Sequence, residues 1–295
     1  MKNERAAEMK YENLFLDRER ALYALHDARV ENCVFSGPAD GESALKECRN
    51  ITVESCRFDL RYPLWHLEKG GVSNCAMTEN CRAALWYDRD VLIENSVLKG
   101  IKALRECDNI VINGCDASSR EFGWFCRGVQ ISKTKLVSEY PFMHSEGLKI
   151  AELDMTGKYS FQYVKNAVLK DCVLDTKDAF WHAENVRIEN SVVKGEYAAW
   201  YSKNLTFVNC RIEGTQPFCY AQGLVLENCE MVGTDLAFEN SDVNARISGC
   251  VQSVKNPKSG RIEADGFGEI ILDENAGVAR SCTIVDNGRC KRKSA

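Results

Sequence analysis

The chain lacks long apolar runs, and it contains little proline and histidine, with 5 and 4 residues among 295. No stretch reaches the roughly 18 apolar residues expected of a membrane-spanning helix. The charged start, Met1-Lys2-Asn3-Glu4-Arg5, leads into no apolar segment like that of a signal peptide. We therefore expect a cytoplasmic protein with no membrane partner.

A basic surface is also missing. Lysine and arginine total 38 against 43 aspartates and glutamates, which gives a net charge of −5, and the only basic cluster is Lys291-Arg292-Lys293. Proteins that bind nucleic acids carry a basic patch or stripe. The composition therefore argues against a DNA or RNA partner.

Cysteine, by contrast, is abundant, with 15 residues. In a small secreted chain this number would indicate a disulfide framework, whereas without a signal peptide we expect reduced thiols. Structural zinc sites use paired cysteines a few residues apart, and the sequence has no such pairs. It also has no phosphate-binding loop or dinucleotide motif. We therefore expect no metal site and no cofactor.

The cysteines belong to an internal repeat of the form apolar-x-apolar-x-Asn-Cys/Ser-x-apolar, as in Val91–Leu98. We take the Cys/Ser site as position 0 of each repeat. It is occupied in turn by Cys33, Cys56, Cys75, Ser96, Cys115, Thr134, Leu153, Cys172, Ser191, Cys210, Cys229 and Cys250. The successive spacings are 23, 19, 21, then 19 seven times, and 21. A period this regular identifies a repeat architecture.

A 19-residue unit is too short for paired helices, and apolar residues two positions apart indicate strands. Each repeat is predicted to form one coil, with positions −5, −3, 0 and +2 pointing inward. Asn and Gly recur at −1 and −6, and Gly at +4, where three corners need residues that tolerate left-handed backbone. We predict an all-β fold, a single-stranded parallel β-helix of about 12 coils. We expect it to be right-handed because parallel crossovers favour that hand.

The period also predicts the domain organisation. Residues 1–20 are expected to form an N-terminal cap, 21–250 the β-helix, and 251–295 irregular last coils and a C-terminal cap, because uncovered end coils would expose unpaired backbone. Position −7 alternates in charge along the coils, which predicts a self-paired surface ladder. Its members are Arg49, Glu68, Arg89, Asp108, Arg127, Glu146, Lys165, Glu184 and Lys203.

The asparagine-cornered coil resembles the pectate-lyase-like right-handed β-helix superfamily. Its short regular repeat, rich in Cys and Trp, is similar to an uncharacterised bacterial family within that superfamily, a domain of unknown function. The resemblance covers roughly residues 20 to 250 and implies the fold. It implies no activity, because function depends on sites that differ among proteins of one fold.

All tryptophans fall at position −10, and three histidines share position −9 with tyrosines and a phenylalanine. Position −11 holds Leu and Phe without charge, so we expect −11 inside and the tryptophans outside or half-buried. The −9 residues are expected to stack between coils. An exposed aromatic stripe would be an interaction surface; alternatively, the rings only cover or fill the core. Arg105 interrupts the tryptophan column, and Glu106 interrupts the column at −9. These two charged residues form either a binding spot flanked by Trp86 and Trp124 or only an ion pair on the surface.

Carboxylate pairs of the kind used in glycoside hydrolysis are scarce. Outside the charge ladder, adjacent coils share only Glu152 with Asp171 and Glu31 with Glu54, and neither pair has a third partner. No catalytic residue is therefore assigned. As an alternative function, an atypical carbohydrate-active enzyme, such as a glycan hydrolase, lyase or isomerase, would place Glu106, His144 and His182 around a cleft.

The sequence thus predicts a non-enzymatic binding or self-associating β-helix protein that uses an exposed Trp/Tyr/His stripe. Its partner would be a carbohydrate ligand, for which the rings would serve as a stacking platform, or a second copy in a homodimer. The predicted binding residues are Trp65, Trp86, Arg105, Glu106, Trp124, His144, Trp181, His182 and Trp200.

Overall fold

The computed structural model describes residues 9–37, 42–273 and 281–290. Its contacts divide the chain into two compact units, Met1–Val137 and Ser138–Ala295, which are treated separately below. Parts of both expected caps, residues 1–8, 274–280 and 291–295, lie outside the described residues. None of the described residues forms a helix that is long and apolar enough to cross a membrane.

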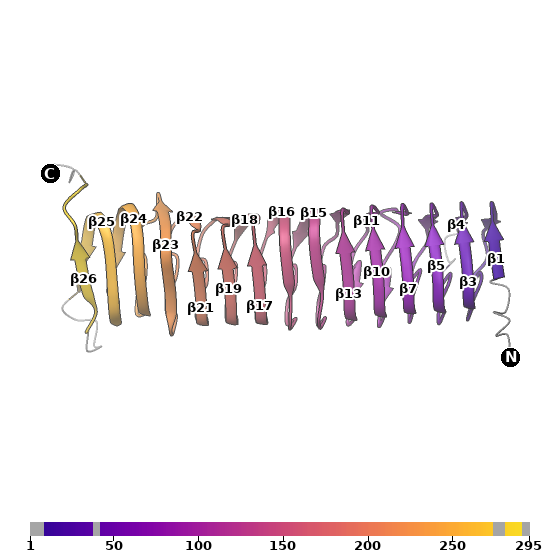
Figure 1. Ribbon diagram of the computed structural model, residues 1–295, viewed down its shortest axis with the longest axis horizontal. Coiled ribbons are helices and arrows are strands. Elements are labelled where there is room, and N and C mark those ends of the chain that lie inside the picture. The colour runs from indigo at the N-terminus through magenta and orange to yellow at the C-terminus, as the bar shows by residue number, and fades with distance from the viewer. Residues whose placement is uncertain (1–8, 38–41, 274–280, 291–295) are drawn as a thin grey trace, which may run out of the picture. The chain divides into compact units, whose positions relative to one another are not determined.

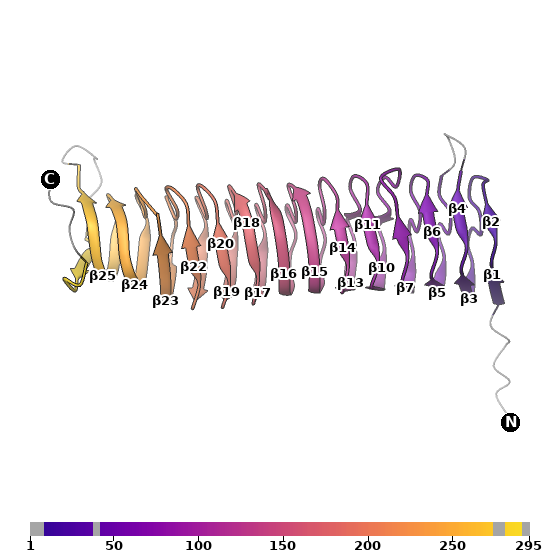
Figure 2. The same cartoon turned by 90° about the horizontal axis from the view of Figure 1, so that it is seen from above.

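The first unit consists of parallel strands that pair from coil to coil (Figures 1 and 2). One ladder comprises β1 (Met9–Glu12), β3 (His26–Glu31), β5 (Arg49–Glu54), β7 (Glu68–Ser73), β10 (Arg89–Glu94), β13 (Asp108–Asn113) and β15 (Gln130–Glu139). The other comprises β2 (Phe15–Leu16), β4 (Val34–Ser36), β6 (Arg57–Asp59), β8 (Ala76–Met77), β11 (Val97–Lys99), β14 (Asp116–Ser118) and β15. On the third side, β9 (Leu85–Trp86) pairs with β12 (Leu104–Arg105).

The second unit repeats this arrangement. Its first ladder comprises β16 (Lys149–Lys158), β17 (Lys165–Lys170), β19 (Glu184–Glu189), β21 (Lys203–Val208), β23 (Leu224–Val232), β24 (Asp242–Lys255), β25 (Ser259–Ile271) and β26 (Thr283–Asp286). Its second comprises β16, β18 (Val173–Lys177), β20 (Val192–Lys194), β22 (Arg211–Glu213) and β23.

The predicted all-β parallel β-helix is confirmed, with coils that repeat at the predicted spacing of about 19 residues. The coils number about 14 rather than about 12. The difference arises at the ends, because β1 and β2 already pair with β3 and β4, and β25 and β26 continue the ladder beyond residue 250. The right hand of the helix stays a prediction.

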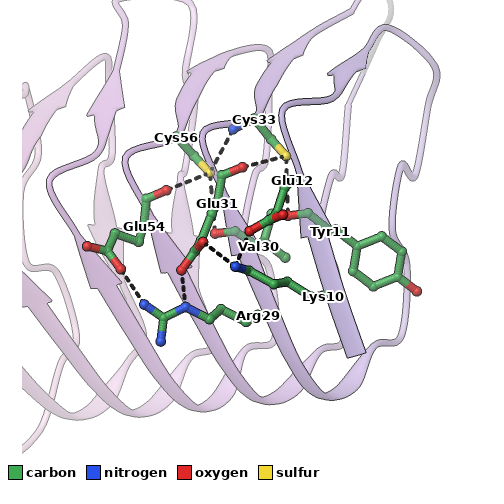
Figure 3. Close-up of polar contacts among 9 residues, drawn as sticks. All are labelled: Lys10, Tyr11, Glu12, Arg29, Val30, Glu31, Cys33, Glu54 and Cys56. Carbon is green, nitrogen blue, oxygen red and sulfur yellow. Dashed lines mark hydrogen bonds and ion pairs between the residues drawn. The ribbon is translucent and has the colours of Figure 1, made fainter. Parts of the chain in front are cut away.

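Burial follows the predicted inward columns. Phe35 and Phe58 stack inside the first unit with ring centroids 4.9 Å apart, and both are fully buried. The position-0 thiols are buried as well and help to tie coils together, since the Cys33 amide donates to the Cys56 thiol of the next coil at 3.4 Å (Figure 3). On the outer surface of the same coils, Arg29 bridges Glu31 and Glu54. Each coil is therefore held to its neighbours from both faces.

The predicted asparagine corners are also confirmed. Asn190, Asn209 and Asn228 have φ of 49°, 51° and 53°. Their side chains form a ladder in which Asn209 Nδ2 donates to Asn190 Oδ1 at 3.2 Å and Asn228 Nδ2 donates to Asn209 Oδ1 at 2.9 Å. The amides thereby stabilise a backbone conformation that is costly for most L-residues.

One cysteine prediction is wrong. Cys250 and Cys290 form a disulfide with their Cα atoms 5.9 Å apart, although all thiols were expected to be reduced. The reason is tertiary: the tail returns to β25, where the Arg289 amide donates to the Asp265 carbonyl at 2.8 Å. The 13 other cysteines are free, and among them only Cys282 is not buried. Burial raises the pKa of Cys48 to about 11, which keeps its thiol protonated and unreactive.

Candidate functional site: an aromatic groove

The third side of each coil, positions −13 to −9, carries the predicted site residues in an unusual backbone. Positions −13, −11 and −9 have positive φ, as in Asp178, Phe180 and His182 at 54°, 60° and 54°. Backbone amides two residues apart donate hydrogen bonds to opposite neighbouring coils. The His182 amide donates to the Trp200 carbonyl of the following coil at 3.0 Å, and the Phe180 amide donates to the Ser160 carbonyl of the preceding coil at 2.8 Å. As a result of this alternation, the side chains at three successive positions differ in how deeply they are buried. Position −11 is buried, −10 half-buried and −9 mostly exposed.

The tryptophan column of the first unit is built around cations. Trp65 and Trp86 stack with centroids 5.3 Å apart. The Lys46 ammonium lies 4.2 Å from the Trp65 ring centroid, and the Arg105 guanidinium lies 5.8 Å and 5.7 Å from the centroids of Trp86 and Trp124. Cation–π attraction explains why charged residues occupy an otherwise aromatic column. The tryptophans are half-buried, which lies within the predicted alternatives.

In the second unit the tryptophans are held by hydrogen bonds. Trp181 and Trp200 stack with centroids 5.4 Å apart and an interplanar angle of 5°. Each indole N–H donates to a backbone carbonyl of the next coil, Trp181 to Tyr197 at 2.6 Å and Trp200 to Gln216 at 2.7 Å. Because their indole N–H groups are bonded to the backbone, these rings form a fixed layer behind the residues at position −9.

We call the position −9 residues the outer aromatic column. In the second unit its rings stack without interruption, with centroid distances of 4.6, 4.9, 5.2 and 4.8 Å and interplanar angles of 4° to 11°. The members are His144, Tyr163, His182, Tyr201 and Tyr220. The predicted stacking is confirmed. Because the faces cover one another along the coil axis, the column presents ring edges to solvent and no open stacking platform.

The strip between the outer aromatic column and the charge ladder at position −7 is hollowed in each unit, and position −8 lies between these two columns. We call this strip the aromatic groove. In the second unit it includes a hollow of about 430 Å³ lined by Tyr201, Tyr220, Ala221, Gln222, Asn240, Asp242 and Lys258. In the first unit it includes one of about 460 Å³ lined by Tyr87, Glu106, Asp108, Phe125 and Arg127. Both units therefore build the same type of groove from the same columns.

The charged residues of the groove are largely paired with one another. In the first unit, Arg105 Nε lies 3.0 Å from Glu106 Oε1, and Arg127 Nε lies 2.9 Å from Asp108 Oδ1. Neighbouring coils of the ladder are joined by ion pairs such as Arg49–Glu68 at 3.4 Å and Lys165–Glu184 at 3.7 Å. The predicted charge ladder is confirmed by these pairs. Such exposed pairs contribute little to stability.

A buried acid beneath the first-unit groove was missed. Asp88 occupies position −8 and is 1% exposed, and its Oδ1 accepts a hydrogen bond from the Leu67 amide at 2.8 Å. Burial, reinforced by the nearby Cys107 thiol, raises the pKa of Asp88 well above its usual range. Burial therefore favours the protonated form of this carboxyl. A sequence signal existed, because Asp88 is the one acid in a column that otherwise holds Cys, Ser, Ala, Leu and Val from Leu25 to Ala221.

The structure brings the predicted binding residues together in two sets. Trp65, Trp86, Arg105, Glu106 and Trp124 are contiguous in the first unit. The second unit joins Trp181 to Trp200 and, through Tyr163, His144 to His182. The predicted list left out the hydroxyls of the outer aromatic column and Asn240, Asp242 and Lys258. Within residues 9–37, 42–273 and 281–290, no group of three His, Cys, Asp or Glu could hold a metal ion.

Over residues 9–285 the sequence matches the family described as "Protein of unknown function (DUF3737)". The chain belongs to this family. The match confirms the resemblance to an uncharacterised β-helix family that the repeat indicated. A search of curated proteins found nothing similar to this DUF3737 chain.

Several solved structures are similar to the DUF3737 chain in fold. The catalytic unit of an α-1,3-glucanase from Streptomyces thermodiastaticus is 8% identical with a TM-score of 0.40, covering 97% of this chain and 62% of that one. The chain thus spans about three fifths of the glucanase unit. The A-module of a mannuronan C-5 epimerase from Azotobacter vinelandii is 10% identical with a TM-score of 0.30, covering 93% and 86%.

A tailspike protein of Escherichia coli bacteriophage HK620, in complex with a hexasaccharide, is 12% identical with a TM-score of 0.31, covering 94% of this chain and 66% of that one. The glucanase and the epimerase are named for a carbohydrate, and the tailspike protein is in complex with one. At these identities the likeness concerns the fold alone.

Proposed function

We propose that the protein is a non-enzymatic binding protein whose aromatic groove holds a linear carbohydrate chain. The observation that carries the proposal is the uninterrupted stack from His144 to Tyr220, which sets one polar ring edge on each of five successive coils of the second unit. Coils follow one another at about 4.8 Å. The groove thus offers a regular row of hydrogen-bonding groups to a ligand that repeats along the same axis.

The chemistry of the row suits a ligand rich in hydroxyl groups. A phenol both donates and accepts a hydrogen bond, and a neutral imidazole does the same through its two nitrogens. Tyr163 and Tyr201 are 40% and 44% exposed, so their edges are accessible while their faces are covered. Across the groove, Gln222, Asp242 and Lys258 add acceptors and donors. These groups can bond sugar hydroxyls from both sides.

The stack also lowers the cost of binding. The three inner rings of the column, Tyr163, His182 and Tyr201, are each held between two neighbours. The half-buried tryptophans behind them are fixed by their own hydrogen bonds. Little side-chain freedom remains to be lost when a ligand is bound, which is the basis of preorganised recognition.

Catalysis is not part of the proposal. In the first-unit groove, Glu106 and Asp108 are each held by an arginine, at 3.0 Å and 2.9 Å. Asp88, whose raised pKa would suit a general acid, is buried beneath the groove and does not reach a bound ligand. A carboxylate pair free to act on a glycosidic bond is therefore not formed by these three residues.

The test removes the hydroxyls and keeps the rings. A triple variant, Tyr163→Phe, Tyr201→Phe and Tyr220→Phe, should retain the stack and fold normally. Binding to immobilised neutral and acidic oligosaccharides identifies a glycan, and titration calorimetry then measures its affinity. The triple variant should bind it at least tenfold more weakly. The control is Tyr159→Phe, which changes a ring of the Tyr140–Tyr159 stack outside the groove lining.

Two results would contradict the proposal. One is a panel in which no oligosaccharide binds, or binding that the triple variant and the control alter equally. The other is sedimentation of the purified chain at twice its mass of 33.2 kDa, with return to the single mass in the triple variant. That outcome would assign the aromatic groove to a homodimer instead of a glycan.

A further inference from the structure

A second hollow of the second unit lies on a different side of the coil from the aromatic groove. It measures about 510 Å³ and lies on the outer surface of β21, β23, β24 and β25, which are neighbours in one ladder (Figure 1). Its lining is Val208, Asn209, Val225, Leu226, Glu227, Asn228, Asn244, Ala245, Arg246, Arg261 and Glu263. None of these residues belongs to the columns described above for carbohydrate binding.

On this side of the coil, two strands have an arginine at position −4 that pairs with the glutamate at −2 of the same strand. The pairs Arg29–Glu31 in β3 and Arg187–Glu189 in β19 are in direct contact, and an equivalent pair in β25, Arg261–Glu263, is 3.1 Å long. At the hollow the two halves of this pair are separated. Strand β23 has Glu227 without an arginine two residues before it, and β24 has Arg246 without a glutamate.

A β-bulge lies where these two charges oppose one another across the ladder. The register between β23 and β24 shifts after Leu226 pairs with Ala245, so Glu227 and Asn228 together oppose Arg246. Bulges re-aim side chains and are frequent beside binding sites. Among the described residues, neither Glu227 nor Arg246 has an ion pair within 4 Å.

The acid on the other side of Arg246 is already engaged. Glu263 is the partner of Arg246 in the β24–β25 register, but it is bonded by Arg261 at 3.1 Å and receives a further hydrogen bond from Asn287. The Arg261 guanidinium holds the pKa of Glu263 below its usual range. Arg246 adds to this effect by its charge, but it forms no ion pair within 4 Å among the described residues and its side chain is exposed at the hollow.

Amides and an apolar floor complete the hollow. The asparagine ladder ends at Asn228, whose Nδ2 donates to Asn209 and whose Oδ1 has no partner among the described residues. Asn244 adds a second exposed amide. Val208 and Val225 are half-buried between these polar groups and form a floor. The hollow therefore combines one available cation, one available anion, two amides and an apolar base.

We propose that this hollow is a binding site for a zwitterionic ligand of the short-peptide class. The ligand carboxylate binds Arg246, its ammonium binds Glu227, its peptide group bonds the amides of Asn228 and Asn244, and its side chains lie on the valine floor. Two charges that form no ion pair with one another in the structure are both satisfied by a ligand that carries the opposite charges at its ends.

The charge balance of the lining supports a zwitterion over a simple ion. Arg246 and Arg261 are matched by Glu227 and Glu263, so the lining has no net charge. An anion would meet Glu227 next to Arg246, and a cation would meet Arg246 next to Glu227. Only a ligand with both charges gains from both groups, since guanidinium and carboxylate form strong charge-assisted bonds with opposite ions.

The test uses the dipeptide Ala-Val and its blocked forms as probes in titration calorimetry. Acetylation of the amino end leaves an anion, and amidation of the carboxyl end leaves a cation. Each blocked form should bind at least tenfold more weakly than the free dipeptide. In the protein, Glu227→Gln and Arg246→Gln should each weaken binding at least tenfold. Arg187→Gln is the matched control, because it removes a paired arginine of the same side outside the hollow.

Several results would overturn the proposal. These are equal affinity for the free and blocked dipeptides, absence of dipeptide binding at millimolar concentration, or loss of affinity in Arg187→Gln equal to that in Arg246→Gln. Should a variant fold poorly, the comparison of the three probes on the unaltered protein still decides. The tyrosine triple variant of the aromatic groove should bind Ala-Val normally, so the two proposed sites succeed or fail separately.

Discussion

Asp88 provides a sharp test of the first-unit core. Its carboxyl is fully buried at position −8 and accepts one hydrogen bond, from the Leu67 amide at 2.8 Å, while Oδ2 has no partner among the described residues. Desolvation disfavours the charged form and raises the pKa of Asp88. We therefore expect Asp88→Asn, which keeps the shape and the Leu67 contact without a titratable group, to stabilise the protein at neutral pH.

The sign and size of the effect follow from proton linkage. In the unfolded chain this carboxyl loses its proton near pH 3.9, whereas the folded chain retains it up to the raised pKa. Between these two pKa values the unfolded state binds fewer protons. The free energy of unfolding therefore falls by about 1.4 kcal/mol for each pH unit of increase. In Asp88→Asn this contribution disappears, so the variant gains about that amount over the parent per pH unit.

Urea unfolding of both proteins at pH 5, 6, 7 and 8 measures this difference directly. The gap between the two free energies should widen as the pH rises and should level off above the folded pKa of Asp88. The conservative surface variant Asp116→Asn serves as a control for general charge effects. Parallel pH profiles for Asp88→Asn and the parent would refute the assignment of a protonated, buried carboxyl.

Three further predictions concern the corners and the thiols. Asn209→Ala should cost about 1 kcal/mol or more, because a positive φ loses its side-chain amide; an unchanged denaturation midpoint would contradict the asparagine ladder. Cys290→Ser should remove about 4 kcal/mol, the loop-entropy value for a 40-residue separation, and hydrogen exchange should quicken in β26 first, whereas unchanged protection there would count against the disulfide. Under native conditions a thiol reagent should modify Cys282 first, because the other free thiols are buried; fast labelling of Cys172 would show that position 0 faces outward.

Much of the fold was readable from the sequence because the repeat imposes one environment on each position. Seven equal spacings of 19 residues required a coil, and Phe142, Phe161 and Phe180 at position −11 required an inside column. All three are fully buried. The stacking of His144, Tyr163 and His182 was predictable for the same reason, since residues one period apart must be neighbours along the axis.

The candidate site was only partly predictable. The sequence placed Trp181 and Trp200 in one column, but it could not show that their indole N–H groups donate hydrogen bonds to backbone carbonyls of the next coil. The aromatic stripe was also considered as a possible stacking platform, whereas the rings of the outer aromatic column turn their edges outward. Ring orientation depends on the alternating positive φ of positions −13, −11 and −9, which side-chain type alone does not reveal.

The sequence by itself determined the period, the parallel coil, the inward columns and the asparagine corners, because each is a property that recurs with the repeat. Only the tertiary structure decided the features that occur once. The Cys250–Cys290 disulfide requires the tail to return to β24 and β25, and the hollow at Arg246 requires a register shift between two strands. A periodic pattern specifies what every coil shares. Such single contacts depend on how particular coils depart from it.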